Sequence, residues 1–285
     1  MKKSIFIFLV SVLTSFSFSQ NLKGNWAGIL IPNGQSFDKA KPIYLNFEDE
    51  DGSKGKTRIE IMDGVDFSVK TIDGKKDNNQ IKVTEGPINR SSGTRLSPNC
   101  KLIYTLSYDN ETGYLSGDYS SSDCRAEIGK VVLFRSKYEV TTEKEPEATH
   151  LWTHLFIRNY KKGYPAPEIL KKEQENFQFQ TIYFDFDEAD IRPEFQDYLN
   201  RLARILDAIH DLRVKITGHT DGEGTDGYNI GLSERRADAI RDYFKSRGVE
   251  PEKLDIDFKG KREPTATNET PEGRQLNRRV VFEFI

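Results

Sequence analysis

Charged and hydrogen-bonding residues occur at fixed spacing in the last third of the chain. A first group runs from Gly218 to Gly224 (GHTDGEG) and continues through Asn229 to residues 232–237 (LSERRA). A second group covers residues 268–274 (NETPEGR) and 277–280 (NRRV). Carboxylate and guanidinium groups form charge-assisted hydrogen bonds with small charged ligands. The pattern is too specific to serve packing alone, so we take these two groups as the candidate binding site.

This pattern resembles the peptidoglycan-binding C-terminal domain of the OmpA-like (outer membrane protein A) family. The family pattern reads GHTDxxGxxxxNxxLSxxRA, and every fixed position of it is present here at the same spacing. An Asn-Asp/Glu-Thr, a Glu-Gly-Arg and an Asn-Arg-Arg-Val follow in the family, and 268–280 matches them. The resemblance covers about residues 177–285. It implies a domain that binds the diaminopimelate residue of the peptidoglycan stem peptide, without a cofactor.

The implied ligand ends in a zwitterion, with an ammonium and a carboxylate on one carbon. By the resemblance, the Asp221 carboxylate receives the ammonium from a loop that follows a strand. The Arg236 guanidinium then binds the carboxylate through two parallel hydrogen bonds. We expect Ser233 to be the N-cap of a helix. Arg236 would then lie in its first turn, where free N–H groups also favour an anion.

The resemblance places further residues around the same pocket. Asn229 precedes the expected helix, Asp185 follows the first strand and Arg278 begins the last one, and Thr220 and Leu232 belong to the same site. Several of the site residues have a structural alternative. Asp221 and Arg236 could form a salt bridge that holds the fold, Asn229 could cap the helix, and Arg278 could be a charge on the sheet surface.

Other residues capable of chemistry are sparse. His150 and His154 are spaced i and i+4, which is half of a metal site, but no third ligand of certain position accompanies them. We interpret both as surface or packing histidines, and His219 as a packing or hydrogen-bonding residue. A wall-degrading enzyme needs a zinc centre, a Cys-His pair or two poised carboxylates. The binding segment has none of these in recognisable spacing, so we predict neither an enzyme nor a metal site.

Hydrophobic periodicity predicts the elements that position the site. Strands are expected at residues 181–186, 212–218, 254–258 and 280–285, and helices at 193–210 and 232–247. The order β-α-β-α-β-β is that of a two-layer sandwich with a mixed sheet and its helices on one face.

The N-terminal half shows period-two alternation of apolar residues between turn residues. Eight short antiparallel strands are expected, at 24–31, 42–47, 57–62, 65–72, 80–88, 102–108, 113–119 and 128–134. Asp63-Gly64, Asp73-Gly74 and Thr112-Gly113 are hairpin-type turn signals. The strands are too short and too charged for a membrane barrel, so a soluble barrel or sandwich is predicted. Trp26, beside two glycines, resembles the entrance strand of the lipocalins.

The chain has two cysteines, Cys100 and Cys124. In an exported protein they would form a disulfide that closes a loop of roughly 25 residues, worth about 3 kcal/mol in the chain-entropy model. Two free buried thiols are the alternative.

Residues 1–19 have the features of a cleaved secretory signal peptide. Lys2 and Lys3 precede a short apolar run, and small residues follow near the expected cleavage site. We therefore predict an exported, periplasmic protein. The predicted domains are a β domain at 20–138, a linker with short helices at 139–176, and the OmpA-like domain at 177–285. Together they make an α+β protein.

Composition limits the partners. With 42 Lys and Arg, 45 Asp and Glu and a net charge of −3, the chain is not expected to bind nucleic acid through bulk positive charge. The leading hypothesis is a non-catalytic peptidoglycan anchor, associated with the cell wall and the outer membrane. Its β domain would face another outer-membrane or periplasmic protein. The alternative is a wall-tethered carrier whose barrel binds a small apolar ligand. Replacing Asp221 or Arg236 with alanine should abolish wall binding while the melting temperature stays near that of the wild type.

Overall fold

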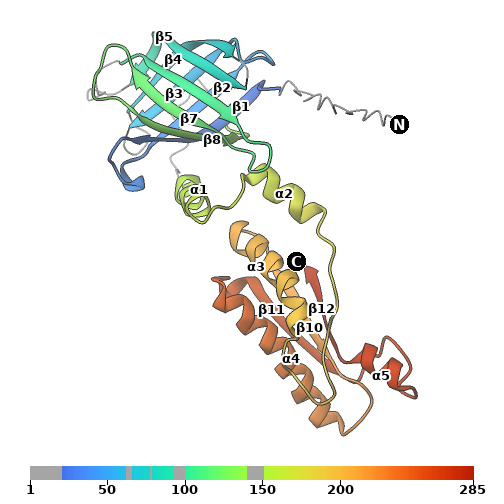
Figure 1. The fold of residues 1–285 in the computed structure, drawn as a ribbon. Coiled ribbons are helices and arrows are strands. Elements are labelled where there is room, and N and C mark those ends of the chain that lie inside the picture. The colour runs from blue at the N-terminus through green and yellow to red at the C-terminus, as the bar shows by residue number, and fades with distance from the viewer. Residues whose placement is uncertain (1–20, 62–65, 78, 93–99, 140–150) are drawn as a thin grey trace, which may run out of the picture. The chain divides into compact units, whose positions relative to one another are not determined.

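The computed structural model describes residues 21–61, 66–77, 79–92, 100–139 and 151–285 (Figure 1). The predicted signal peptide, the Asp63-Gly64 turn and His150 lie outside these residues. The chain divides into two compact units. Of the described residues, the first comprises those up to 107 together with 117–131 and 136–139, and the second comprises 108–116, 132–135 and 151–285. Each is described by itself below. Within the described ranges, none of the helices is long and apolar enough to cross a membrane.

Eight antiparallel strands close into a barrel, as the alternation predicted. They are β1 (Gly24–Pro32), β2 (Lys41–Phe47), β3 (Lys54–Ile61), β4 (Asp66–Asp77), β5 (Gln80–Ser92), β6 (Leu102–Tyr108), β7 (Leu115–Ser121) and β8 (Gly129–Arg135), with a 3-10 turn η1 (Phe37–Lys39) between β1 and β2. Neighbouring strands follow one another in sequence order around the barrel. A closed barrel of eight strands in sequence order is also the architecture of the lipocalins, which the Trp26 strand resembles.

One predicted turn is wrong. Asp73 and Gly74 lie inside β4, where they pair with β3 or β5 instead of reversing the chain. A Cβ atom on Gly74 would lie 2.0 Å from the carbonyl oxygen of Gly52. Glycine is therefore needed there for a close approach of two backbones, a use that sequence does not distinguish from a turn.

An ion pair lies inside the barrel. Lys70 Nζ is 2.7 Å from Glu85 Oε2, and both side chains are almost fully buried. Glu85 on β5 also accepts hydrogen bonds from Thr57 Oγ1 on β3 and from the Tyr104 hydroxyl on β6, which it can reach only through the interior. Trp26, fully buried, is another large side chain of this unit. These groups fill part of the barrel interior with charged and hydrogen-bonding side chains.

Cys100 and Cys124 form a disulfide with a Cα–Cα distance of 5.6 Å, as predicted for an exported protein. It joins the segment before β6 to the segment before β8. Lys70 Nζ donates a hydrogen bond to the Cys100 carbonyl, so the buried ion pair and the disulfide are adjacent.

The connector carries two helices, α1 (Leu151–Lys161) and α2 (Pro167–Glu175), where two short helices were expected. Both belong to the second unit and contact helix α3 (Gln196–Ala208). Asn159 Nδ2 donates to the Ala208 carbonyl at 2.8 Å, and Lys162 Nζ is 2.7 Å from the buried carboxylate of Asp207. Hence these helices pack as part of the second unit. His154 on α1 is exposed.

The C-terminal part of the second unit is a four-stranded sheet covered by helices. Its strands are β9 (Ile182–Tyr183), β10 (Val214–His219), β11 (Leu254–Gly260) and β12 (Arg279–Phe284), in the order β11-β10-β12-β9. β10 and β11 are parallel, and β12 is antiparallel to its neighbours. Helices α3 and α4 (Asp226–Ser246) supply Leu199, Leu202, Ile205, Ile240 and Phe244 to the core. The mixed two-layer fold is thus confirmed.

The structure differs from the expected elements in three ways: additional short helices, a shorter first strand and an earlier start of α4. A helix α5 (Pro271–Asn277) precedes β12, and 3-10 turns η2 (Pro193–Phe195) and η3 (Pro251–Lys253) precede α3 and β11. The first strand is reduced to two residues, Ile182 and Tyr183, so residues 184–192 are free to follow an irregular path beside the site.

The third difference concerns the start of α4. The helix begins at Asp226 and not at Leu232, and its N-cap is Thr225, whose hydroxyl accepts from the Tyr228 amide. Ser233 lies inside the helix, where its hydroxyl donates to the Ile230 carbonyl and accepts from the Gly260 amide. Gly227, Asn229 and Gly231 have low helix propensity, which is why these turns read as loop in the sequence. Arg236 is therefore well inside the helix, and the helix N-terminus does not contribute the N–H groups we expected beside it.

Candidate functional site

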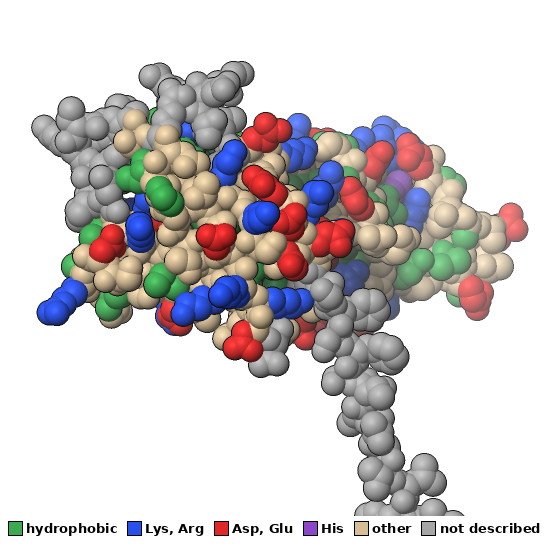
Figure 2. All heavy atoms as spheres, turned by 90° about the horizontal axis from the view of Figure 1, so that it is seen from above, with side chains coloured by type: hydrophobic (Ala, Val, Ile, Leu, Met, Phe, Trp, Pro, Cys, Tyr) green, Lys and Arg blue, Asp and Glu red, His purple; other side chains and the backbone are tan. Residues whose placement is uncertain are grey.

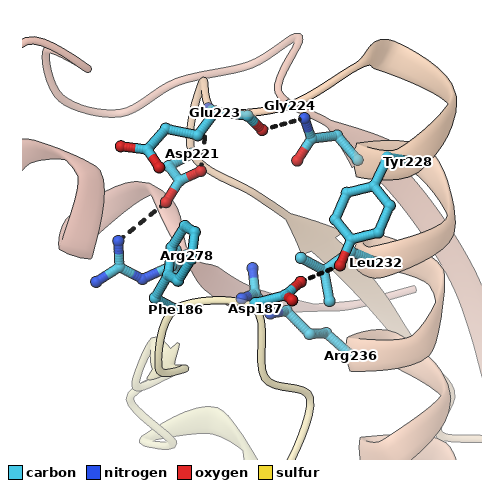
Figure 3. Close-up of a pocket in the computed structure, with 10 residues that line it drawn as sticks. Phe186, Asp187, Asp221, Glu223, Gly224, Tyr228, Leu232, Arg236 and Arg278 are labelled. Carbon is cyan, nitrogen blue, oxygen red and sulfur yellow. Dashed lines mark hydrogen bonds and ion pairs between the residues drawn. The ribbon is translucent and has the colours of Figure 1, made fainter.

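A pocket of about 240 Å³ opens between the β10–α4 loop, the start of α4 and the segment after β9 (Figure 3). Its lining residues are Phe186, Asp187, Asp221, Glu223, Gly224, Tyr228, Asn229, Leu232, Arg236 and Arg278. Five residues named from sequence are among them: Asp221, Asn229, Leu232, Arg236 and Arg278. On the surface drawn in Figure 2, positive and negative side chains are interspersed.

Close backbone packing places Asp221 at the end of β10. A Cβ atom on Gly218 would lie 2.1 Å from the Ser233 carbonyl oxygen, so glycine lets β10 approach α4. Residues of α5 and of the segment that precedes α5 hold the β10–α4 loop in place. Asn268 accepts from the Gly222 amide at 2.8 Å, and Arg274 Nε is 3.0 Å from Glu223 Oε1.

Asp221 is buried and ion-paired. Its Oδ2 accepts from Arg278 Nη1 at 2.9 Å, and its Oδ1 accepts from the Glu223 amide at 3.2 Å. Arg278 also donates from Nε to the Phe184 carbonyl at 3.3 Å. The fold-holding salt bridge at this site thus joins Asp221 to Arg278, in place of the Asp221–Arg236 bridge that was the structural alternative.

Arg236 is fully buried and holds three backbone carbonyls. Nε donates to Glu188 at 2.8 Å, Nη1 to His219 at 3.0 Å, and Nη2 to Asp185 at 3.0 Å. Among the described residues, no carboxylate lies within ion-pair distance of this guanidinium. Burial lowers the pKa of Arg236 to about 10, so it remains charged at neutral pH. A buried cation with two N–H groups to spare and no paired anion favours an anionic ligand.

Asn229 and Thr220 stabilise the β10–α4 loop through hydrogen bonds. Asn229 is buried and donates from Nδ2 to the carbonyls of Glu223 and Thr225, at 2.7 and 3.1 Å, so it ties the loop to the start of α4. Thr220 is buried, its amide donates to the Gly260 carbonyl at 3.0 Å, and it is not among the lining residues. Leu232 supplies an apolar wall.

The structure does not bring the Asp185 carboxylate to the pocket. That side chain is exposed and paired with Arg192, and only its backbone carbonyl reaches Arg236. Asp187 and Phe186 line the pocket instead. Asp187 has a positive φ of 61°, so the chain turns there and side chains no longer alternate as in a strand. The sequence contains only a weak signal that Asp187 would take the place of Asp185. Acidic residues occur at 185, 187, 188 and 190, and their spacing follows no strand or helix period.

His219 has a structural role beside the site. Its side chain is buried, and burial together with Arg279 lowers its pKa to about 4. Asp257 and Lys259 also act on it, in opposite directions. Its Nδ1 has no hydrogen-bond partner within the described part of the chain. The neutral imidazole is therefore the form that the folded chain holds.

This buried histidine predicts acid sensitivity. The folded pKa lies below the ordinary value of 6.5. The unfolded chain therefore binds the proton first, and stability falls as pH drops from about 6.5 to about 4. The contribution is about 3 kcal/mol. Urea unfolding at pH 7 and pH 4 should show a smaller acid-induced loss for His219→Gln than for the wild type. His210→Gln, at an exposed histidine, is the control and should behave as the wild type. An unchanged pH dependence in His219→Gln would contradict this assignment.

The C-terminal part of the chain is similar in sequence to known proteins. The OmpA family model matches residues 183–278. Outer membrane protein A of Bordetella avium is 41% identical over 124 residues, which are 44% of this chain and 62% of that protein. The peptidoglycan-associated lipoprotein of Haemophilus influenzae is 36% identical over 122 residues, 43% of this chain and 76% of that protein. The crystal structure of the peptidoglycan-associated lipoprotein from Burkholderia pseudomallei is 29% identical, with a TM-score of 0.37, over 37% of this chain and 90% of that one. The chain thus spans less than two thirds of the Bordetella protein.

Proposed function

Because this chain belongs to the OmpA family, we propose that it binds peptidoglycan without covalent attachment and anchors its β-barrel to the cell wall. The relatives named peptidoglycan-associated lipoprotein support this binding partner. The ligand group is the diaminopimelate residue of the stem peptide. The role is binding and not catalysis.

The buried Arg236 guanidinium carries the proposal. It faces a pocket that also contains Asp221, and no carboxylate of the described chain neutralises it. Its two remaining N–H groups receive the carboxylate of the ligand, while the Asp221 carboxylate receives the ammonium. Both charges of one amino-acid end are thereby bound in a buried site. A ligand with a single charge would leave one of these groups unpaired, at a cost in affinity.

The other lining residues have supporting roles in this proposal. Arg278 orients the Asp221 carboxylate, Asn229 holds the loop, and Leu232 contacts the methylene chain of the ligand. Thr220 acts through the backbone at the end of β10. Asp187 replaces Asp185 as the acidic residue from the segment after β9.

We further propose the cellular setting. Residues 1–19 direct export and are removed, and the mature protein is periplasmic, at the cell wall and the outer membrane. The barrel, residues 20–138, presents a surface to another envelope protein, while 139–176 connects it to the binding domain at 177–285. No observation favours the alternative, a wall-tethered carrier whose barrel binds a small apolar ligand, since the interior groups described above are charged or hydrogen-bonding.

The test is sedimentation of the purified full chain with peptidoglycan sacculi. The wild type should enter the pellet, and free meso-diaminopimelate should release it. Asp221→Asn should weaken binding by about 10- to 100-fold, because a charged hydrogen bond to the ammonium is lost. Asp185→Asn is the matched control and should bind as the wild type, since that carboxylate pairs with Arg192 outside the pocket. Wild-type protein that stays in the supernatant would rule out the anchor.

A further inference from the structure

Two of the interactions between lining residues join side chains from different segments of the pocket wall. One is the Asp221–Arg278 ion pair. The other joins the Tyr228 hydroxyl on α4 to Asp187 Oδ1 on the segment after β9 (Figure 3). The first is buried, whereas Tyr228 is 47% exposed and Asp187 is also exposed. The second bridge can therefore break and form without disturbing the core.

The two ends of this outer bridge differ in rigidity. Tyr228 is in the first turn of α4, where its amide donates to the N-cap Thr225 and the next residue, Asn229, is tied to the Glu223 carbonyl. Asp187 belongs to an irregular segment and has positive φ. Tyr228 is thus held by the helix, whereas the exposed Asp187 side chain can turn away from it while the carbonyls of Asp185 and Glu188 stay bonded to Arg236.

The backbone on either side of Asp187 is hydrogen-bonded to the Arg236 guanidinium. Arg236 donates to the carbonyls of Asp185 and Glu188, which flank Asp187 on either side. The Glu188 amide in turn donates to the Asp185 carbonyl at 3.2 Å, which closes a turn. An anion that draws the Arg236 N–H groups toward itself therefore acts directly on the turn that carries Asp187.

We propose that the Tyr228–Asp187 hydrogen bond is a latch on the pocket, which opens to admit the ligand and re-forms once the ligand is bound. This inference rests on the proposed function. The Tyr228 hydroxyl is protonated at neutral pH and can donate to Asp187, and this bond raises its pKa further. A hydrogen bond from a hydroxyl to a surface carboxylate favours the closed state by about tenfold.

A latch has a kinetic signature that a simple ligand contact lacks. Removing it raises the association rate, because entry no longer waits for opening, and raises the dissociation rate, because the ligand is no longer enclosed. A residue that only touches the ligand changes mainly the dissociation rate. The two rate constants together therefore decide the assignment.

The experiment is stopped-flow binding of the full chain to the tripeptide L-Ala–γ-D-Glu–meso-diaminopimelate, labelled with a fluorophore on the alanine amine. Tyr228→Phe keeps the ring and removes the hydroxyl. Both rate constants should rise by about three- to tenfold. Asp187→Asn should give a smaller rise, since the amide oxygen still accepts, and the double variant should not exceed Tyr228→Phe. Tyr243→Phe is the matched control, because Tyr243 is on the same helix and its hydroxyl bonds to Gln196 and Asn200.

The outcomes separate the latch from the proposed function. Wild-type rates in Tyr228→Phe, or a rise in dissociation alone, would overturn the latch while leaving peptidoglycan binding intact. A wild type that does not bind the tripeptide would overturn the proposed function and the latch with it. As a second measurement, hydrogen exchange of the 185–188 amides in the ligand-free protein should accelerate in Tyr228→Phe and stay unchanged in Tyr243→Phe. An unchanged exchange rate in Tyr228→Phe counts against the latch.

Discussion

Arg236→Ala should abolish peptidoglycan binding and also destabilise the second unit by about 3–5 kcal/mol. Three carbonyls, of Asp185, Glu188 and His219, would lose their donor in a buried place. Each unsatisfied carbonyl costs about 1–3 kcal/mol. The sequence alone led us to expect an unchanged melting temperature, and the structure reverses that expectation because the guanidinium also holds the backbone.

The binding loss has a separate cause. With the guanidinium gone, the ligand carboxylate loses two charge-assisted hydrogen bonds, which corresponds to a loss of affinity of at least about 100-fold. Arg236→Lys should keep the charge but not the planar fork, so it should lose about half as much stability and still bind at least about tenfold more weakly.

Urea unfolding and sacculus sedimentation measure the two effects on the same samples. Arg235→Ala is the control for stability, because Arg235 is the neighbouring residue on the same helix and is exposed. Its unfolding free energy should stay within about 0.5 kcal/mol of the wild type. If Arg236→Ala melted as the wild type does, the three backbone contacts would have no stabilising role.

The second large effect is expected inside the barrel. Lys70→Met should destabilise the barrel by about 3–5 kcal/mol, because the Glu85 carboxylate would be left buried without its cation. The Lys70 and Glu85 side chains are 4% and 0% exposed. Glu85 would keep its bonds from Thr57, Tyr104 and the Leu102 amide, which together do not neutralise its charge.

Substituting Glu85, alone and together with Lys70, separates the contribution of the ion pair from the effects of the single side chains. Glu85→Gln should be similarly destabilising, because Lys70 is then the unpaired charge, whereas Lys70→Met with Glu85→Leu should cost less than the sum of the single changes. Calorimetry of the full chain measures each variant. Lys130→Met is the matched control, since the Lys130–Asp118 pair is about two-thirds exposed on both sides and should contribute at most about 1 kcal/mol. A Lys70→Met variant within 1 kcal/mol of the wild type would contradict the buried-pair argument.

Sequence patterns predicted the architecture because they record burial along each element. Period-two alternation marked the barrel strands, and the 3.6-residue apolar stripe of α3 marked a core-facing helix. The fixed spacing of the GHTD segment and of Arg236 also brought Asp221 and Arg236 to one pocket, as the resemblance implied. These features depend on residue type and spacing, which sequence contains in full.

The details of the site depended on the path of the backbone. Asp187 replaced Asp185 in the pocket because β9 ends after two residues and the chain turns at a positive φ. The start of α4 moved to Asp226 because tertiary contacts stabilise turns that contain Gly227 and Gly231 against their low propensity.

By itself, the sequence determined two predominantly structured parts, the family of the second and the residue types of its binding site. Only the tertiary structure decided which carboxylate pairs with which arginine. It also decided that Arg236 holds three carbonyls, and that Lys70 and Glu85 meet inside the barrel. The physical reason is that a hydrogen bond or ion pair requires two groups within about 3–4 Å. Such distances between residues far apart in the chain are set by how loops and strands pack, and residue spacing does not encode them.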